Sequence, residues 1–267
     1  MKTKAHILQL INPRLNIKWL VSNSTGKGVK VAIIDSGVDA SHPALRGKVK
    51  RACVVHDHNG KIRCQSLSGK KSSDSFGHGS GVAGIILDLA PDAEITSVKV
   101  LGENNTGSGE ALIAGLRWAL DKKFKLINMS LATINEKFVP ALFELCEQAY
   151  VQDTILVVSK RNFGPLGYPA MFSSVISVDC EDYEDKYKVT RYLKNRIQYG
   201  ARGQDLELVY LNGEYHRSSG TSFATPHVTA IAALLLSIFP DIRSCQVKAA
   251  LDKFSQDYNN KKTKDRR

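Results

Sequence analysis

Short apolar runs alternate with helix-like segments along most of the chain. The first run, residues 29–34, is rich in β-branched side chains and is followed by Asp35, Ser36 and Gly37, which is typical of a strand that ends in a turn. Nearly continuous apolar strands separated by helices are typical of a parallel sheet that helices cover on both faces. The alternation therefore predicts an α/β fold with a doubly wound, mostly parallel sheet.

The same reading gives approximate bounds for the other elements. A two-residue hairpin turn is expected at Asn212-Gly213, and the polar run His56-Asp57-His58 is expected to lie in a loop that ends at Asn59-Gly60. With no internal repeat or linker, residues 1–255 are expected to form one domain and residues 256–267 a basic, disordered tail. Further strands are expected at 48–56, 94–100, 126–129, 154–158, 175–178, 206–210 and 214–216, and helices at 79–89, 110–122, 140–150, 221–239 and 243–254.

The chain is basic, with 37 Lys and Arg against 26 Asp and Glu, a formal net charge of +11. A basic surface attracts nucleic acid or acidic peptides. However, the sequence has no zinc-finger spacing, aromatic RNA-binding motif or arginine-rich arm, so nucleic acid is not an expected partner.

Location and metal content are also constrained. No apolar run approaches the roughly 18 residues of a membrane span, and polar residues interrupt the first residues before a secretory apolar region forms. The five cysteines form no CxxC pair and no zinc-site spacing. We therefore expect a cytoplasmic protein with reduced thiols, no membrane partner, no metal and no cofactor.

Polar residues follow several of the expected strands. Asp35 ends the first strand, Ser130 follows residues 126–129, and Asn162 comes shortly after residues 154–158. In open α/β sheets, ligands bind at the carboxyl ends of the strands. These side chains are therefore expected to lie along one edge of one sheet.

Three segments carry residues suited to acyl transfer. They are residues 33–39, 77–84 and 220–228, which contain Asp35, His78 and Ser222. A serine attacks an amide only when a base removes its proton, and a carboxylate commonly orients the histidine that does so. Taken singly, each residue also has a structural explanation, as a turn residue or a helix cap. The order Asp, His, Ser is the one found in subtilisin.

All three segments resemble the signature blocks of the subtilisin-like serine proteases, including the Ser-x-Ala-x-Pro core that begins at Ser222. The resemblance extends from about Gly28 to about Asp252. It implies that Ser222 is the nucleophile, that His78 is base and then acid, and that Asp35 orients the imidazole. It also implies that the Asn162 side chain and the Ser222 backbone N–H form the oxyanion hole.

The resemblance further implies where a peptide substrate binds. Its backbone would pair with Ser130, Leu131 and Ala132, and Gly167 would form the floor of the pocket for the residue before the cut. The family pattern also makes Tyr168-Pro169 a candidate cis peptide. His227 belongs to the same block as Ser222, but one helical turn later, and is expected to be a packed helix histidine.

Two departures from the family pattern concern this pocket. The residue before Asn162 is Arg161, preceded by Lys160, where the family usually has glycine. Ala132 likewise stands where a glycine is usual. Both changes add bulk where glycine lets backbone and substrate approach. They predict a restricted substrate range, with a preference for an acidic residue near the scissile bond.

Two further departures concern calcium and folding. No insertion interrupts residues 85–91, and Ala44 replaces an expected aspartate, so no calcium is expected at that site. The catalytic-type segment begins almost at once, which leaves no room for a long prodomain, so either the chain folds unaided or a precursor was trimmed. A cytoplasmic protease without one must be restrained by narrow specificity or by a protein inhibitor or regulator. We therefore expect a dedicated processing enzyme, for example one that removes a leader from a peptide precursor.

Two other functions compete with this one. A catalytically weak pseudoprotease that serves as a binding or regulatory module would explain Arg161 and Ala132, but Asp35, His78, Ser222 and Asn162 are all present. A lipase or esterase would need a Gly-x-Ser-x-Gly elbow and the order Ser, Asp, His. Ser222 lies instead in Gly-Thr-Ser-Phe-Ala, which excludes that reading.

Overall fold

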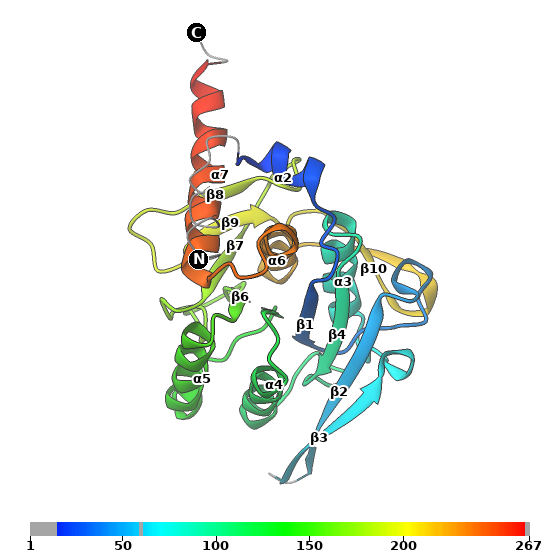
Figure 1. The fold of residues 1–267 in the computed structure, drawn as a ribbon. Coiled ribbons are helices and arrows are strands. Elements are labelled where there is room, and N and C mark those ends of the chain that lie inside the picture. The colour runs from blue at the N-terminus through cyan, green and yellow to red at the C-terminus, as the bar shows by residue number, and fades with distance from the viewer. Residues whose placement is uncertain (1–14, 59–60, 265–267) are drawn as a thin grey trace.

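The structure is a computed structural model and describes residues 15–58 and 61–264. These residues form a nine-stranded sheet with the order β3-β2-β4-β1-β5-β6-β7-β9-β8 (Figure 1). Adjacent strands are parallel except for the pairs β2–β3 and β8–β9 at the two edges. The strands are β1 (Lys30–Asp35), β2 (Val49–His58), β3 (Lys61–Ser68), β4 (Glu94–Lys99), β5 (Leu126–Met129), β6 (Ile155–Ser159), β7 (Ile176–Glu181), β8 (Val189–Arg191) and β9 (Tyr199–Arg202).

Helices cover both faces of this sheet, as the sequence predicts (Figure 1). One apolar layer contains residues of α2 (Ile17–Asn23), α3 (His78–Leu89), α6 (Thr221–Ile238) and α7 (Ser244–Lys264). The opposite layer is built from α4 (Gly109–Asp121) and α5 (Val139–Val151). The doubly wound, mostly parallel α/β architecture is therefore confirmed.

Helix α6 lies at the centre of its layer. It is apolar on every side and packs against α3 and against strands β5, β6, β7 and β9. By length and hydropathy it could cross a membrane, but 83% of it is buried inside the molecule, which is how a core helix behaves. The hydrophobic packing of α6 fixes the position of its first turn, which carries Ser222.

Three local expectations differ from the structure. Strand β2 includes His56, as the predicted strand 48–56 does, but pairing with β3 extends it through Asp57 and His58, which therefore do not lie in a loop. Strands β10 (Leu206–Val209) and β11 (Tyr215–Ser218) do form a hairpin, but Val209 pairs with Tyr215, so five residues connect them instead of two. A 3-10 turn occupies this connection, with Asn212 at φ 58°.

The last helix is also longer than expected. Helix α7 continues to Lys264, so helical backbone reaches into the segment 256–267 that the sequence predicts to be a disordered tail. The final three residues of that segment lie outside the described part of the chain, and the division into a domain and a tail stays a prediction.

Candidate active site

Asp35 and His78 meet at the carboxyl end of β1. Asp35 is the last residue of the strand and is fully buried, and its Oδ1 lies 2.7 Å from His78 Nδ1. The same oxygen accepts a hydrogen bond from the Ser36 backbone N–H at 2.7 Å. Gly79 permits this approach, since a Cβ there would lie 2.0 Å from the Gly37 carbonyl oxygen. The contact fixes Nδ1 as the protonated ring nitrogen and leaves Nε2 as an acceptor.

Burial and charge act in opposite directions on the His78 imidazole. Burial lowers its pKa because the charged form loses solvation, and this is the largest single influence. The charge and hydrogen bond of Asp35, together with the charge of Asp74, outweigh burial. The pKa of His78 is therefore raised above its ordinary value of 6.5. The site favours an imidazolium once the ring has accepted a proton.

Asp74 holds the loop that presents His78. Its Oδ1 accepts from the Ser36 hydroxyl at 2.8 Å and from the Gly77 backbone N–H at 2.9 Å. Its Oδ2 accepts from the Ser80 backbone N–H at 2.8 Å and from the Ser80 hydroxyl at 2.7 Å. A carboxylate that accepts several hydrogen bonds cross-links the segments that donate them. Asp74 thus ties the end of β1 to the first turn of α3.

Ser222 is the second residue of α6. The His78 ring contacts that of the next residue, Phe223, with 5.1 Å between centroids. Ser222 Oγ donates to the Ser130 carbonyl at 3.1 Å, and its backbone carbonyl accepts from the Ser130 hydroxyl at 2.8 Å. That carbonyl is available because Pro226, four residues later, has no N–H to donate. No hydrogen bond joins Ser222 Oγ to His78 among the described residues.

A buried polar network holds the first turn of α6 against β5. The Asn128 side chain donates to Ser130 Oγ at 3.0 Å and accepts from the Thr229 hydroxyl at 2.7 Å. Ser130 Oγ in turn donates to Ser222. Because buried polar groups are costly unless they are paired, this network specifies one position of the helix relative to the strand.

Asn162 lies at the N-terminus of α6. Its Oδ1 accepts from the Thr221 backbone N–H at 2.9 Å and from the Thr221 hydroxyl at 3.0 Å. Because a backbone N–H can only donate, this contact fixes the side-chain amide with its NH₂ group directed elsewhere. Within the described part of the chain, the Ser222 N–H also has no acceptor. The Asn162 NH₂ group, the Ser222 N–H and the helix N-terminus are donors of the kind that stabilises negative charge.

Space for a substrate side chain is limited beside Gly167. A Cβ added at Gly167 would lie 2.9 Å from Arg161 Cδ and 3.1 Å from Ala132 Cβ. The Arg161 guanidinium donates to the Pro165 carbonyl at 3.1 Å, which holds its aliphatic stem across this space. The side chains of both bulky departures, Arg161 and Ala132, therefore lie against Gly167.

The segment after β5 and the neighbouring loop frame this pocket. Thr133 pairs with Tyr168 through two backbone hydrogen bonds of 2.8 and 2.9 Å, and Leu131 packs partly against the core. The Tyr168–Pro169 peptide bond is cis, which confirms the prediction. Lys160 Nζ lies 2.7 Å from Asp179 Oδ2, so its charge is already paired. Of the two cations noted in the sequence, only Arg161 lacks a carboxylate partner among the described residues.

His227 is a packed core residue, as expected. It is 3% exposed, and its Nδ1 hydrogen-bonds to the Phe223 carbonyl at 2.9 Å. Burial lowers the pKa of His227 to about 4, so it is neutral at physiological pH. In residues 15–58 and 61–264, no group of three or more His, Cys, Asp or Glu could hold a metal ion, and α3 runs without interruption.

Several residues that build the site were not found by sequence reasoning. They are Asp74, Thr221, Asn128 and Thr229, and each acts by positioning a neighbour. Only Asp74 carried a usable signal, because it is a carboxylate four residues before His78 in a run of small polar residues.

Comparisons with known proteins converge on one family. The model of the subtilase family matches residues 26–266. The chain is 32% identical over 241 residues to the minor extracellular protease Epr of Bacillus subtilis, covering 86% of this chain but only 35% of that protein's length. It is 30% identical over 230 residues to an intracellular serine protease of Paenibacillus polymyxa, covering 80% of this chain and 68% of that one. The crystal structure of a cold-adapted subtilisin-like serine proteinase superposes with a TM-score of 0.71 at 26% identity, covering 86% of this chain and 83% of that one.

Proposed function

Because the chain belongs to the subtilase family of serine proteases, we propose that it cleaves peptide bonds with Ser222 as nucleophile, His78 as general base and Asp35 as its orienting carboxylate. The observation that carries the proposal is the 2.7 Å contact of His78 with buried Asp35 beside the first turn of α6. A buried carboxylate on Nδ1 holds the tautomer that leaves Nε2 free to accept a proton.

The chemistry follows from these contacts. Rotation about its Cα–Cβ bond moves the Ser222 hydroxyl from the Ser130 carbonyl toward His78 Nε2. As the oxygen attacks the substrate carbonyl, its proton passes to His78, and Asp35 stabilises the resulting imidazolium. The imidazolium then protonates the leaving amine, and water hydrolyses the acyl-enzyme by the reverse transfer.

The oxyanion would lie at the start of α6. The Ser222 N–H and the Asn162 NH₂ group donate to the oxygen that becomes negative, and the helix dipole adds to their effect. Thr221 supports this role because its N–H and hydroxyl fix the Asn162 amide in the donating orientation. The substrate backbone would pair as an added strand along Ser130, Leu131 and Ala132.

We infer a narrow preference at the residue before the cut. The stem of Arg161 and the methyl group of Ala132 occupy space against Gly167, which favours small side chains over large apolar ones. Any preference for an acidic residue rests on Arg161 alone, because Asp179 already neutralises Lys160.

A matched pair of variants tests this preference. Fluorogenic peptides with Ala, Glu or Phe before the cut would be compared by kcat/KM. The wild type is expected to cleave the Phe peptide least, and Arg161→Gly is expected to improve it by about tenfold to a hundredfold by vacating the pocket. Lys160→Gln, which leaves that space filled, is the control. Equal use of Phe by the wild type and Arg161→Gly would contradict the proposed pocket.

The biological role that fits narrow specificity is processing. We propose that the enzyme trims one class of precursor peptide, such as by removing a leader, in the cytoplasm. The similarity to an intracellular serine protease supports this location, whereas the similarity to Epr, an extracellular protease, argues against it. Cell fractionation with an antibody against the native chain tests the location.

A second candidate is a binding module with the same fold. It is favoured by the Ser222 hydroxyl, which contacts Ser130 and not His78, and by the filled pocket at Gly167. Mass spectrometry of a proteome-derived peptide mixture separates the two. New termini that appear with the wild type and not with Ser222→Ala support the protease. Identical peptide patterns for both proteins would leave only the binding module.

A further inference from the structure

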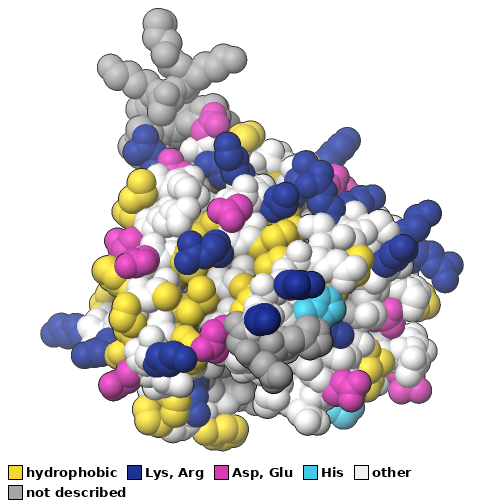
Figure 2. Space-filling model, turned by 90° about the horizontal axis from the view of Figure 1, so that it is seen from below, with side chains coloured by type: hydrophobic (Ala, Val, Ile, Leu, Met, Phe, Trp, Pro, Cys, Tyr) yellow, Lys and Arg dark blue, Asp and Glu magenta, His cyan; other side chains and the backbone are white. Residues whose placement is uncertain are grey.

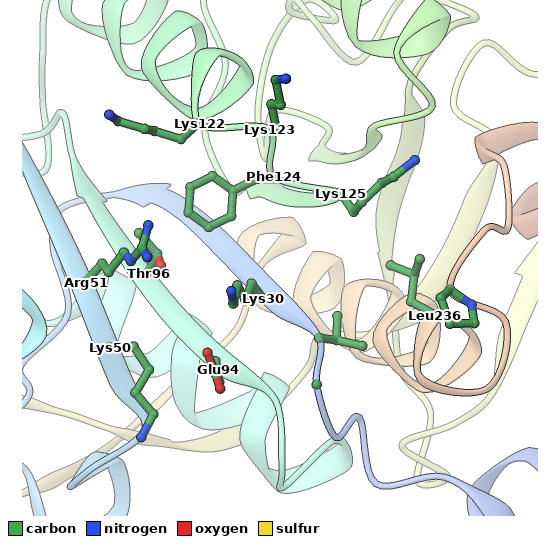
Figure 3. A pocket seen from close by; sticks show the side chains of 13 residues that line it. Lys30, Lys50, Arg51, Glu94, Thr96, Lys122, Lys123, Phe124, Lys125 and Leu236 are labelled. Carbon is green, nitrogen blue, oxygen red and sulfur yellow. The ribbon is translucent and has the colours of Figure 1, made fainter.

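A basic cavity of about 520 Å³ lies at the edge of the sheet opposite to Asp35 (Figure 3). The amino ends of β1 and β4, the start of β2 and the segment before β5 surround it, and α6 closes one side. Its lining includes Thr96, which is 3% exposed, and the buried ring of Phe124. The candidate active site does not use any of these residues.

Six cations and a single carboxylate line this cavity. Lys30 comes from β1, two cations come from β2, and three come from the segment between α4 and β5. Glu94 is the neighbour of Lys30 in the strand register, but no ion pair joins any of the six to a carboxylate among the described residues. The six are Lys30, Lys50, Arg51, Lys122, Lys123 and Lys125, which are called the basic pocket below.

The end of helix α4 explains only part of this cluster. Lys122 and Lys123 follow α4, where cations interact favourably with the helix dipole. The helix dipole does not explain Lys30, Lys50 or Arg51, which lie in strands. Lys123 also adopts a left-handed backbone conformation, φ 57°, which glycine would adopt without strain.

The face drawn in Figure 2 carries Lys and Arg side chains together with Asp and Glu side chains. Six exposed cations and one carboxylate line the cavity of the basic pocket. An anion in the cavity would be attracted by several of these cations at once.

We propose that the basic pocket binds a small molecule with several linked phosphate groups, of the di- or triphosphate class. Ammonium and guanidinium groups are the side chains that recognise phosphate oxygens, and several phosphates are needed to neutralise this number of cations. The cavity has the volume of a small-ligand site. The Thr96 hydroxyl and the ring of Phe124 border it, so a nucleoside attached to the phosphates also has a surface to contact.

Isothermal titration calorimetry with inorganic tripolyphosphate and with ATP, both free of metal, tests the proposal. Both should bind the wild type, and binding should weaken as salt is raised from low to moderate concentration. Lys30→Gln/Arg51→Gln should raise the dissociation constant at least on the order of tenfold. The control, Lys194→Gln/Arg196→Gln, removes one lysine and one arginine from the exposed loop between β8 and β9 and should bind like the wild type.

Comparing the affinities of the ligands identifies which kind of ligand the basic pocket binds and shows whether it binds one at all. Tighter binding of ATP than of tripolyphosphate would identify a nucleotide, and equal binding would identify the phosphate chain as sufficient. No binding of either compound, or equal loss in both double variants, overturns the proposal. Tighter binding of oligoglutamate than of either compound, lost in the pocket variant, would replace it with an acidic-peptide site. If the pocket variant does not fold, Lys122→Gln/Lys125→Gln takes its place.

Discussion

The two ends of strand β1 differ in how their charges are compensated. At its carboxyl end, Asp35 is fully buried and bound to His78, and Asp74 ties the surrounding loop together. At its amino end, Lys30 opens into a cavity where six cations have no ion-pair partner among the described residues. Asp35 and His78 are therefore already paired at the carboxyl edge of the sheet, whereas the cations at the amino edge have no ion-pair partner among the described residues.

This difference separates two ways of preparing a protein for a ligand. A catalytic group must already be oriented when substrate arrives, and the buried hydrogen bonds of Asp35 to His78 and Ser36 provide that orientation. A site for a mobile anion can leave its cations solvated until the anion neutralises them. Substitutions at the carboxyl edge should therefore change rates, whereas substitutions at the amino edge should change binding and salt dependence.

Removing the charge of Asp35 should have the largest effect. Asp35→Asn is expected to lower kcat by about four orders of magnitude because the neutral amide no longer holds the required tautomer of His78. Lys30→Gln, at the other end of the same strand, serves as the control and should leave kcat unchanged. Comparable losses in both variants would mean that the two edges are not functionally distinct.

Truncating Asn162 should have the next largest effect. Asn162→Ala is expected to lower kcat by about 10²- to 10³-fold with little change in KM, because its NH₂ group would contact only the developing oxyanion. Steady-state kinetics on the best peptide substrate measures the change. Asn195→Ala, in the loop between β8 and β9, is the control. A rise in KM at constant kcat would indicate that Asn162 binds the ground state instead.

The pKa of His78 offers a direct measure of pairing at the carboxyl edge. NMR titration in a Ser222→Ala background should give a pKa above 6.5, because Asp35 and Asp74 outweigh burial. Adding Asp35→Asn should move the pKa below 6.5, since burial then dominates. The wild-type enzyme should accordingly lose activity as pH falls through the His78 pKa, because only the neutral ring accepts the Ser222 proton. An unchanged pKa would remove the electrostatic role assigned to Asp35.

Salt should have the smallest effect, and it should act at the amino edge. Raising ionic strength screens the repulsion within the basic pocket and is expected to raise Tm by about 1–2 °C. Lys30→Gln/Arg51→Gln should show a smaller salt dependence, whereas Lys194→Gln/Arg196→Gln should match the wild type. Scanning calorimetry at two salt concentrations checks this. An identical salt response in all three proteins would show that the six cations do not interact.

Sequence periodicity was sufficient for most of the architecture. The bounds of β5 were predicted to the residue, and β1, β4, α3 and α4 to within one or two residues, because buried apolar runs determine them. The edge strand β3 was missed because its residues are mostly exposed and polar, so only backbone pairing with β2 reveals it. Asn212-Gly213 predicts a two-residue connection in the hairpin, but these residues form part of a longer turn.

The site was predictable where residue types carry chemistry and not where they act through geometry. Asp35, His78 and Ser222 lie in recognisable segments, and the structure brings all three to the carboxyl edge. The pairing of Lys160 with Asp179 and the position of Arg161 over Gly167 depend on side-chain conformations that no spacing encodes. The sequence does not predict the basic pocket, because its cations come from segments far apart in the chain.

Covalent labelling of Ser222 tests the central claim most directly, because only a serine activated by a neighbouring base reacts rapidly with a fluorophosphonate probe. The account predicts that the wild type incorporates one probe, mapped to Ser222 by mass spectrometry, and that His78→Ala labels far more slowly. Lys30→Gln should label at the wild-type rate. Labelling of the wild type no faster than that of His78→Ala would contradict an assembled catalytic site at the carboxyl edge.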